Sequence, residues 1–148
     1  MRHSQRLKII KKSNECEVIS LTRGSEKIPA LSVLNERQKM DNKIKKIREL
    51  NDNLRQNFSG GKVMVTRGVA DLPLATRLKI MQKVQNFNNF NASNDPYGEH
   101  DFGAFDFNGV TYFWKIDYYD LNYEYLSIDP SDTTITNRVL TIMLADEY

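Results

Sequence analysis

The sequence predicts an α+β fold: two amphipathic helices packed on one face of a small antiparallel β-meander, followed by a C-terminal helix or strand. Three observations predict it. Two segments carry apolar residues at helical spacing, an Asn-Gly pair separates two β-prone runs, and the hydrophobic content of 40% is typical of a globular protein. We expect one domain over residues 36–148, preceded by a basic N-terminal arm over residues 1–35.

The arm differs from the rest of the chain because it has no sustained hydrophobic period. It is rich in Lys and Arg and contains Gly24 and Pro29, which interrupt regular structure. Residues 18–21, VISL, favour a short strand. The arm is therefore either a flexible tail or a contact arm for an acidic partner.

The two helices are predicted over residues 36–58 and 72–88 by apolar residues spaced three or four positions apart. In the first helix these are Met40, Ile44, Ile47, Leu50, Leu54 and Phe58, and in the second Leu74, Leu78, Met81, Val84 and Phe87. Residues 59–61, SGG, end the first helix, and residues 62–66, KVMVT, form a β-prone run. We expect Asp71 to cap the second helix, with Pro73 in its first turn.

A β-hairpin is predicted around Asn108-Gly109, because a two-residue type I′ turn needs a positive φ at both central positions. This turn places Phe105 opposite Tyr112 and Gly103 opposite Trp114. The shared face is almost wholly apolar, and Gly103 leaves room for the indole of Trp114. We expect this face to form the core, covered by the helices.

After the hairpin, residues 123–128, YEYLSI, are expected to add a third strand to the meander. Residues 133–148 fit either a helix, through Ile135, Val139, Ile142 and Met143, or a buried strand, through their β-branched residues. Of these two alternatives we favour the helix.

Charge is divided unevenly along the chain, although the net charge is only +2. Residues 1–40 and 41–93 are basic, whereas residues 94–148 are strongly acidic. Cys16 is the only cysteine, which excludes an intrachain disulfide and fits a reducing, cytoplasmic location. The N-terminus lacks the apolar run of a signal peptide, and no stretch approaches the roughly 18 apolar residues of a membrane span. We expect no membrane association.

Three segments resemble a family of small proteobacterial proteins known only as a domain of unknown function. They contain the motifs GEHDFG (98–103), WKIDYYD (114–120) and RVLTIML (138–144), the last followed by a terminal Glu-Tyr. The similarity covers residues 43–148. Because members of the family are often encoded on plasmids and other mobile elements, the resemblance implies a role in conjugation, anti-defence or regulation.

The best candidate for catalysis is the loop Glu99-His100-Asp101, with Asp106 nearby in the sequence. A histidine titrates near neutral pH, and a neighbouring carboxylate can orient it as a general base. The alternative is a polar turn in which His100 bonds the backbone. The only other histidine, His3, lies in the arm, so we expect neither a two-histidine metal site nor any other cofactor.

Candidate binding residues lie on the first helix and before the second. They are Lys43, Lys45, Lys46, Arg48 and Arg67. Such residues can contact phosphates or an acidic protein, or simply form a solvated surface. The acidic C-terminal third can instead engage a basic partner. We therefore expect a non-enzymatic binding protein for a protein or nucleic-acid partner, with a hydrolytic or metal-assisted enzyme that uses the Glu99-His100-Asp101 loop as the alternative.

Overall fold

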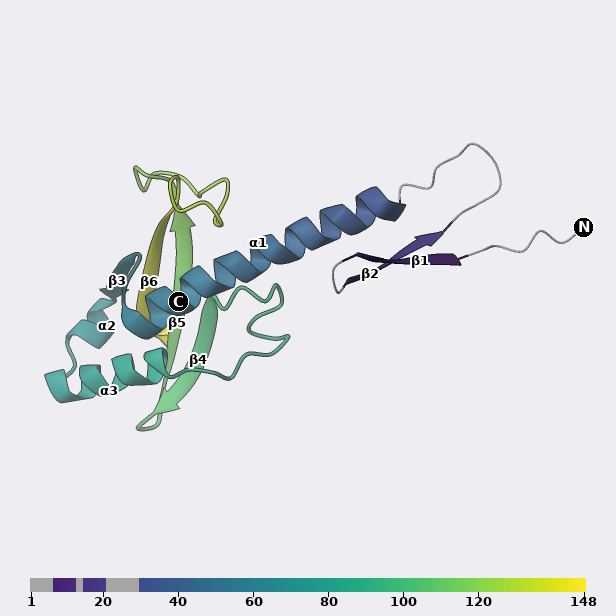
Figure 1. Cartoon of the computed structure of the whole chain (residues 1–148). Coiled ribbons are helices and arrows are strands. Elements are labelled where there is room, and N and C mark those ends of the chain that lie inside the picture. The colour runs from purple at the N-terminus through teal and green to yellow at the C-terminus, as the bar shows by residue number, and fades with distance from the viewer. Residues whose placement is uncertain (1–6, 13–14, 21–29) are drawn as a thin grey trace, which may run out of the picture. The chain divides into compact units, whose positions relative to one another are not determined.

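A computed structural model describes residues 7–12, 15–20 and 30–148 of the chain (Figure 1). The chain divides into two compact units, residues 1–42 and 43–148. In the first unit, β1 (Leu7–Lys12) pairs antiparallel with β2 (Glu15–Ser20). Strand β2 contains three of the four residues expected to form a short strand. Residues 1–6, 13–14 and 21–29 of the predicted arm lie outside the described residues. Among the described residues, no helix is long and apolar enough to cross a membrane.

The second unit is built on a four-stranded sheet with the order β3-β6-β5-β4. Its strands are β3 (Lys62–Val65), β4 (Phe102–Phe107), β5 (Val110–Tyr119) and β6 (Asn137–Leu144). Strands β4, β5 and β6 are antiparallel neighbours, whereas β3 pairs parallel with β6. The α+β class is therefore confirmed, but the sheet is mixed rather than purely antiparallel.

The C-terminal segment is a strand, so the preference for a helix was wrong. Strand β6 lies between β3 and β5, and its apolar residues are buried on both faces of the sheet. A strand buried on both faces lacks the alternation that identifies a strand in sequence. The prediction of a third strand at residues 123–128 is also wrong. Only an isolated β-bridge, between Leu126 and Tyr119, joins that segment to the sheet.

Three helices accompany the sheet: α1 (Ala30–Asn57), α2 (Arg67–Ala70) and α3 (Leu74–Gln85). Helix α1 begins six positions before the predicted start, directly after Pro29, because residues 30–35 contain no breaker. Asp71 does not cap α3. It follows α2, and Pro73 takes the N-cap position of α3.

The core lies between the sheet and the helices α1 and α3, which cover one face of it (Figure 1). The predicted hairpin register is confirmed, with Phe105 opposite Tyr112 and Gly103 opposite Trp114. Trp114 is fully buried, and a Cβ atom on Gly103 would come within 2.5 Å of the indole Nε1. Gly103 is therefore required by the close approach of the indole.

Candidate functional site

The loop between α3 and β4 carries the residues predicted for chemistry. Hydrogen bonds within the loop hold its first part. The backbone carbonyl of Asn91 accepts a bond from the Asp95 N–H at 2.8 Å, and the side-chain Oδ1 of Asn94 accepts one from the Asn91 N–H at 2.8 Å. The chain then reverses through Gly98 and His100, which have φ values of 69° and 54°. Such left-handed backbone is uncommon outside glycine and aims the His100 side chain back toward α1.

His100 lies between two carboxylates and an aromatic ring. Its Nδ1 is 2.9 Å from Asp52 Oδ2 on α1, and its Nε2 is 3.6 Å from Asp95 Oδ2. The imidazole stacks on Phe90, with 3.7 Å between ring centroids and 3° between planes. The His100 N–H donates to Asp95 Oδ1 at 3.0 Å. Every polar group of this side chain therefore faces a group of the same chain.

Asp52 also connects His100 to a buried arginine. Arg55 Nη2 lies 2.8 Å from Asp52 Oδ1, and Arg55 Nη1 donates to the carbonyls of Val84 and Gln85 at 2.9 Å each. These carbonyls are at the C-terminal end of α3, where a cation is electrostatically favoured. The Arg55 side chain is only 2% exposed, so the contact fixes α3 against α1.

Glu99 belongs to a second polar cluster, beside that of His100. Its carboxylate accepts a bond from Tyr118 Oη at 2.8 Å, and its backbone carbonyl accepts one from Asn51 Nδ2 at 2.9 Å. Asn51, which is fully buried, also donates to Tyr118 Oη and accepts from Arg138 Nε at 3.0 Å. Burial raises the pKa of the Tyr118 phenol and lowers the pKa of the Arg138 guanidinium. The phenol therefore stays neutral and donates to Glu99.

The structure does not direct the four residues predicted for catalysis at one common centre. The backbone carbonyl of Asp101 accepts a bond from the Ile116 N–H at 2.8 Å. Burial, together with the nearby charge of Glu99, raises the pKa of the Asp101 carboxyl group. Asp106 lies beside the hairpin turn and accepts a bond from Thr111 at 2.6 Å. In the described part of the chain, no contact joins Asp106 to His100.

The predicted binding residues also contact groups of the same chain. Lys43 pairs with Asp129 at 3.0 Å, Lys45 lies 3.9 Å from Glu49, and Arg67 lies 3.6 Å from Asp71. Arg48 Nε donates to the carbonyl of Gly98 at 2.5 Å, which holds the loop that carries His100. Lys46 is exposed, and its charge adds to the hydrogen bonds from Thr134 that lower the pKa of Asp132. Among these residues, only Lys43 forms an ion pair with an acidic group of the C-terminal third.

Several residues of these clusters were not predicted from the sequence, notably Asn51, Asp52, Phe90, Tyr118 and Arg138. One signal was present: Asn51 follows Ile47 by four positions and precedes Leu54 by three, so a polar residue interrupts the apolar stripe. A buried polar residue in such a stripe needs hydrogen-bond partners. Its partners lie 48 or more positions away, which the sequence did not identify.

The arrangement around His100 is that of a structural cross-link. A general base needs one ring nitrogen on an orienting carboxylate and the other directed at a substrate proton. In this chain Nδ1 and Nε2 both face carboxylates, and one ring face lies on Phe90. Within the described residues, no group of three His, Cys, Asp or Glu side chains is arranged to hold a metal ion.

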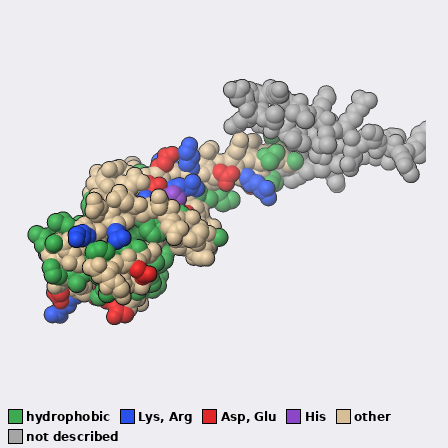
Figure 2. All heavy atoms as spheres, turned by 90° about the horizontal axis from the view of Figure 1, so that it is seen from below, with side chains coloured by type: hydrophobic (Ala, Val, Ile, Leu, Met, Phe, Trp, Pro, Cys, Tyr) green, Lys and Arg blue, Asp and Glu red, His purple; other side chains and the backbone are tan. Residues whose placement is uncertain are grey.

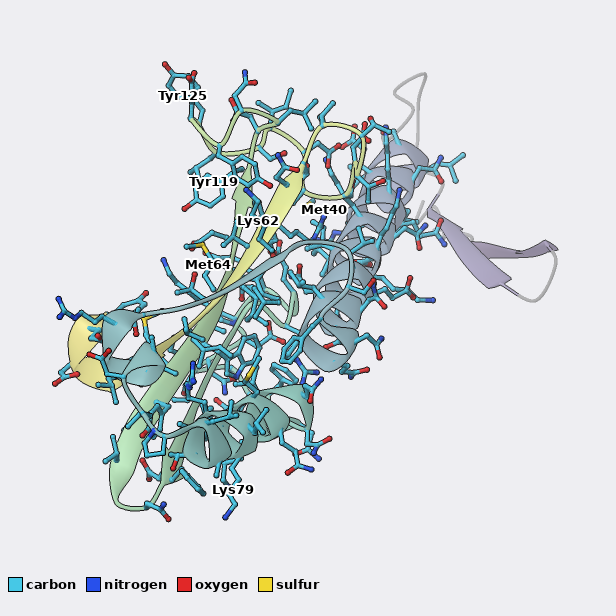
Figure 3. The ribbon with its side chains drawn as sticks, turned by 90° about the vertical axis from the view of Figure 1, so that its left-hand side faces the viewer. Met40, Lys62, Met64, Lys79, Tyr119 and Tyr125 are labelled. Atoms are coloured by element: carbon cyan, nitrogen blue, oxygen red, sulfur yellow. The ribbon has the colours of Figure 1, made fainter. Side chains whose placement is uncertain are left out.

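A different surface feature lies on the β5–β6 loop (residues 120–136). Four large apolar side chains on it are more than half exposed, and we call them the loop patch: Leu121, Tyr125, Leu126 and Ile128. The loop is held by backbone bonds, from Asp120 to the Tyr125 carbonyl at 2.8 Å and from Ser127 to the Tyr118 carbonyl at 3.0 Å. In Figure 3, Tyr125 points outward at the end of this loop. The patch is therefore apolar and fixed in position.

Comparison with known proteins gives one match. Residues 65–147, more than half of the chain, match the model of a family described as "Protein of unknown function (DUF3768)". The match runs from the end of β3 through the hairpin and β6. No curated protein and no solved structure matches the chain.

Proposed function

The chain belongs to the DUF3768 family of proteins of unknown function, and we propose that it is a non-enzymatic binding protein for a protein partner. The loop patch is the observation that carries this proposal. Ile128 is 92% exposed, and Leu126 is 74% exposed. All four side chains of the loop patch line one shallow depression. Exposed apolar side chains that lie together in this way are typical of protein interaction sites.

The chemistry of the partner follows from the rim of the patch. Asp120 and Glu124 lie on the same loop, and Asp132 follows a few positions later. An apolar centre with an acidic rim is complementary to an apolar surface flanked by Lys or Arg. Nucleic acid is disfavoured here, because its phosphates would meet these carboxylates.

The lysines of α1 support the same choice of partner. A phosphate-binding surface needs cations that are available to the phosphates. Lys43 is paired with Asp129, and the guanidinium of Arg48 bonds the Gly98 carbonyl. Charge reversal at Lys45, which pairs with Glu49 on α1 itself and not with the β5–β6 loop, is therefore expected to leave partner binding largely unchanged.

Site-specific photocrosslinking tests the proposal. A photoreactive amino acid at Leu126 should trap a specific protein in an extract of the source organism, and the same group at Leu74 should not. Leu74 is a matched control because it is 62% exposed on α3, away from the loop. With the photoreactive amino acid kept at position 126, the double substitution Tyr125→Asp and Ile128→Asp should abolish the crosslinked species. Equal crosslinking from both positions would refute a specific surface.

The alternative function is a hydrolytic enzyme that uses His100 as a base. The observation in its favour is the 2.9 Å contact between His100 Nδ1 and Asp52, which could orient an imidazole. A reaction would require His100 to leave Asp95 so that Nε2 becomes available. The variant His100→Ala distinguishes this alternative from a structural role, because only a structural role requires a large loss of stability.

The proposal includes a cellular compartment and a type of role. The single cysteine fits a reducing compartment, and we place the protein in the cytoplasm. The resemblance to proteins of mobile elements supports a regulatory or anti-defence role, in which a binding protein acts by occupying a surface of its partner.

A further inference from the structure

A groove of about 670 Å³ lies between α3 and β4, and it shares no lining residue with the loop patch. One face of α3 forms its wall, through Lys79, Gln82, Lys83 and Asn86. Aromatic side chains from the end of α3 and from β4 contribute Phe87, Phe105 and Phe107 to its lining. In Figure 2, which views the molecule from below, blue basic side chains lie among green hydrophobic ones on the side that α3 occupies in Figure 1.

The strand that borders this groove has an open edge. Strand β4 is the last strand of the sheet, so only β5 pairs with it. A two-residue turn makes Phe107 and Val110 a hydrogen-bonded pair, and such pairs alternate along an antiparallel ladder. The backbone N–H and C=O groups of Phe102, Ala104 and Asp106 therefore point away from β5. Within residues 30–148, no hydrogen bond uses these groups.

The edge has little of the usual protection against strand pairing, because its one charged side chain, Asp106, accepts a hydrogen bond from Thr111 on β5. Exposed edge strands commonly carry Lys or Pro, or are interrupted by a bulge. Residues 102–107, FGAFDF, contain neither Lys nor Pro and pair with β5 in continuous register. The edge is therefore chemically ready to accept another strand.

We propose that this groove binds an extended peptide segment as an added strand on β4, with apolar and acidic side chains facing α3. The backbone of the peptide would bond the open edge, and its alternate side chains would enter the groove. This site is separate from the loop patch, so its failure would leave the proposed function of that patch intact.

The two lysines of α3 determine the charge of the peptide. Lys79 and Lys83 are exposed and one helical turn apart, and neither has an ion-pair partner among the described side chains. Figure 3 shows Lys79 on the outer surface of α3. Lys83 Nζ lies 5.6 Å from the centroid of the Phe107 ring, directly beside the aromatic lining. A peptide that carries a carboxylate next to an apolar residue would therefore complement both the Lys83 ammonium group and the Phe107 ring.

A second copy of the chain fits the groove less well than an acidic peptide. Pairing of β4 with another β4 would bring Phe105 and Phe107 toward the lysines. It would bring no carboxylate, because Asp106 alternates to the opposite face of the sheet. Single-stranded nucleic acid would satisfy the lysines but would leave the regularly spaced backbone groups of the edge without matching partners.

The test uses the full chain and a fluorescent heptapeptide, Thr-Glu-Thr-Val-Thr-Glu-Thr, which places Glu and Val on one face when extended. Fluorescence anisotropy should show saturable binding. The double variant Lys79→Glu and Lys83→Glu should weaken it at least about tenfold, which corresponds to about 1.4 kcal/mol. The control Lys39→Glu and Lys45→Glu reverses two exposed lysines elsewhere and should have little effect.

Two further comparisons test the pairing of backbones. Ala104→Pro removes an outward N–H that the sheet does not use and should abolish binding, whereas Ala104→Val should retain it. In an added strand, only every second peptide residue directs its N–H group at β4. N-methylation of the three Glu and Val residues, which face α3, and N-methylation of the four threonines are therefore compared. One of the two modified peptides should lose binding, and the other should retain it. Loss through the threonines indicates antiparallel addition, and loss through the Glu and Val residues indicates parallel addition.

Other outcomes overturn the proposal. Equal weakening by the two N-methylated sets would show that no strand is added. Tighter binding of an oligothymidylate probe than of the peptide, with the same loss in the Lys79 and Lys83 variant, would assign the groove to nucleic acid. A concentration-dependent dimer that Ala104→Pro dissociates would assign the edge to a second copy of the chain.

Discussion

Replacing His100 with Ala tests whether the contacts of this imidazole stabilise the fold. The substitution removes the contact with Asp52, a hydrogen bond to a charged group that typically contributes about 1.5–3 kcal/mol. It also removes the stack on Phe90, for which about 0.5–1.5 kcal/mol is typical of an aromatic pair. Because the His100 side chain is only 21% exposed, little of this is regained from solvent. We expect a loss of about 2–4 kcal/mol in the free energy of unfolding.

Thermal and urea unfolding measure this loss. For a chain of this size, about 3 °C of melting temperature corresponds to 1 kcal/mol, so His100→Ala should lower the melting temperature by about 6–12 °C. A second variant, His100→Asn, separates the side-chain contacts from the backbone, because Asn tolerates the left-handed φ of 54° better than Ala does. It should be less destabilised than His100→Ala but remain below the wild type.

A double-mutant cycle identifies the partner responsible. Asp52→Asn also weakens the contact with Arg55, so its single effect is not a measure of the His100 contact. The coupling energy between Asp52→Asn and His100→Ala should be about 1–3 kcal/mol. If His100→Ala unfolds within about 0.5 kcal/mol of the wild type, the imidazole is not a structural cross-link, and the catalytic alternative gains support.

Other substitutions test the core and the charged loop. Gly103→Ala places a Cβ atom 2.5 Å from the indole Nε1 of Trp114, and overpacking of this kind should cost about 1–3 kcal/mol, measured by urea unfolding. Hydrogen bonds from Ser131 and the ion pair with Lys43 lower the pKa of Asp129 to about 2. Because the unfolded value is higher, stability should fall as the pH drops from about 4 toward 2, and Asp129→Asn should make this dependence shallower. A pH dependence unchanged by Asp129→Asn would contradict this assignment.

The hairpin was predictable because its information is local. An Asn-Gly pair fixes the turn, the turn fixes the register, and the register places Trp114 opposite Gly103. The helices were predictable for the same reason, although Leu74 and Leu78 of the expected stripe are exposed while Ile80 is buried. Helical periodicity identifies an amphipathic helix more securely than it identifies the buried face.

The parallel pairing of β3 with β6 could not be predicted in the same way. Lys62 pairs with Val139 and Val65 with Ile142, so the pairing joins segments 77 positions apart. No turn chemistry specifies such a contact, and only the burial of β6 on both faces accounts for it. The His100 cluster was hidden for a similar reason, because Asp52 lies 48 positions away on α1.

The uneven distribution of charge in the sequence has a structural explanation that narrows the choice of partner. Part of the basic segment folds against the acidic one: Lys43 contacts Asp129, and the charge of Lys46 acts on Asp132. The Lys43–Asp129 ion pair reduces the charge that this part of α1 presents to a polyanion. We therefore expect this protein to recognise its partners through the loop patch and through strand pairing at the open edge of β4. Lys79 and Lys83, which have no such acidic partner in the described part of the chain, line the groove beside the open edge of β4, where a peptide carboxylate would reach them.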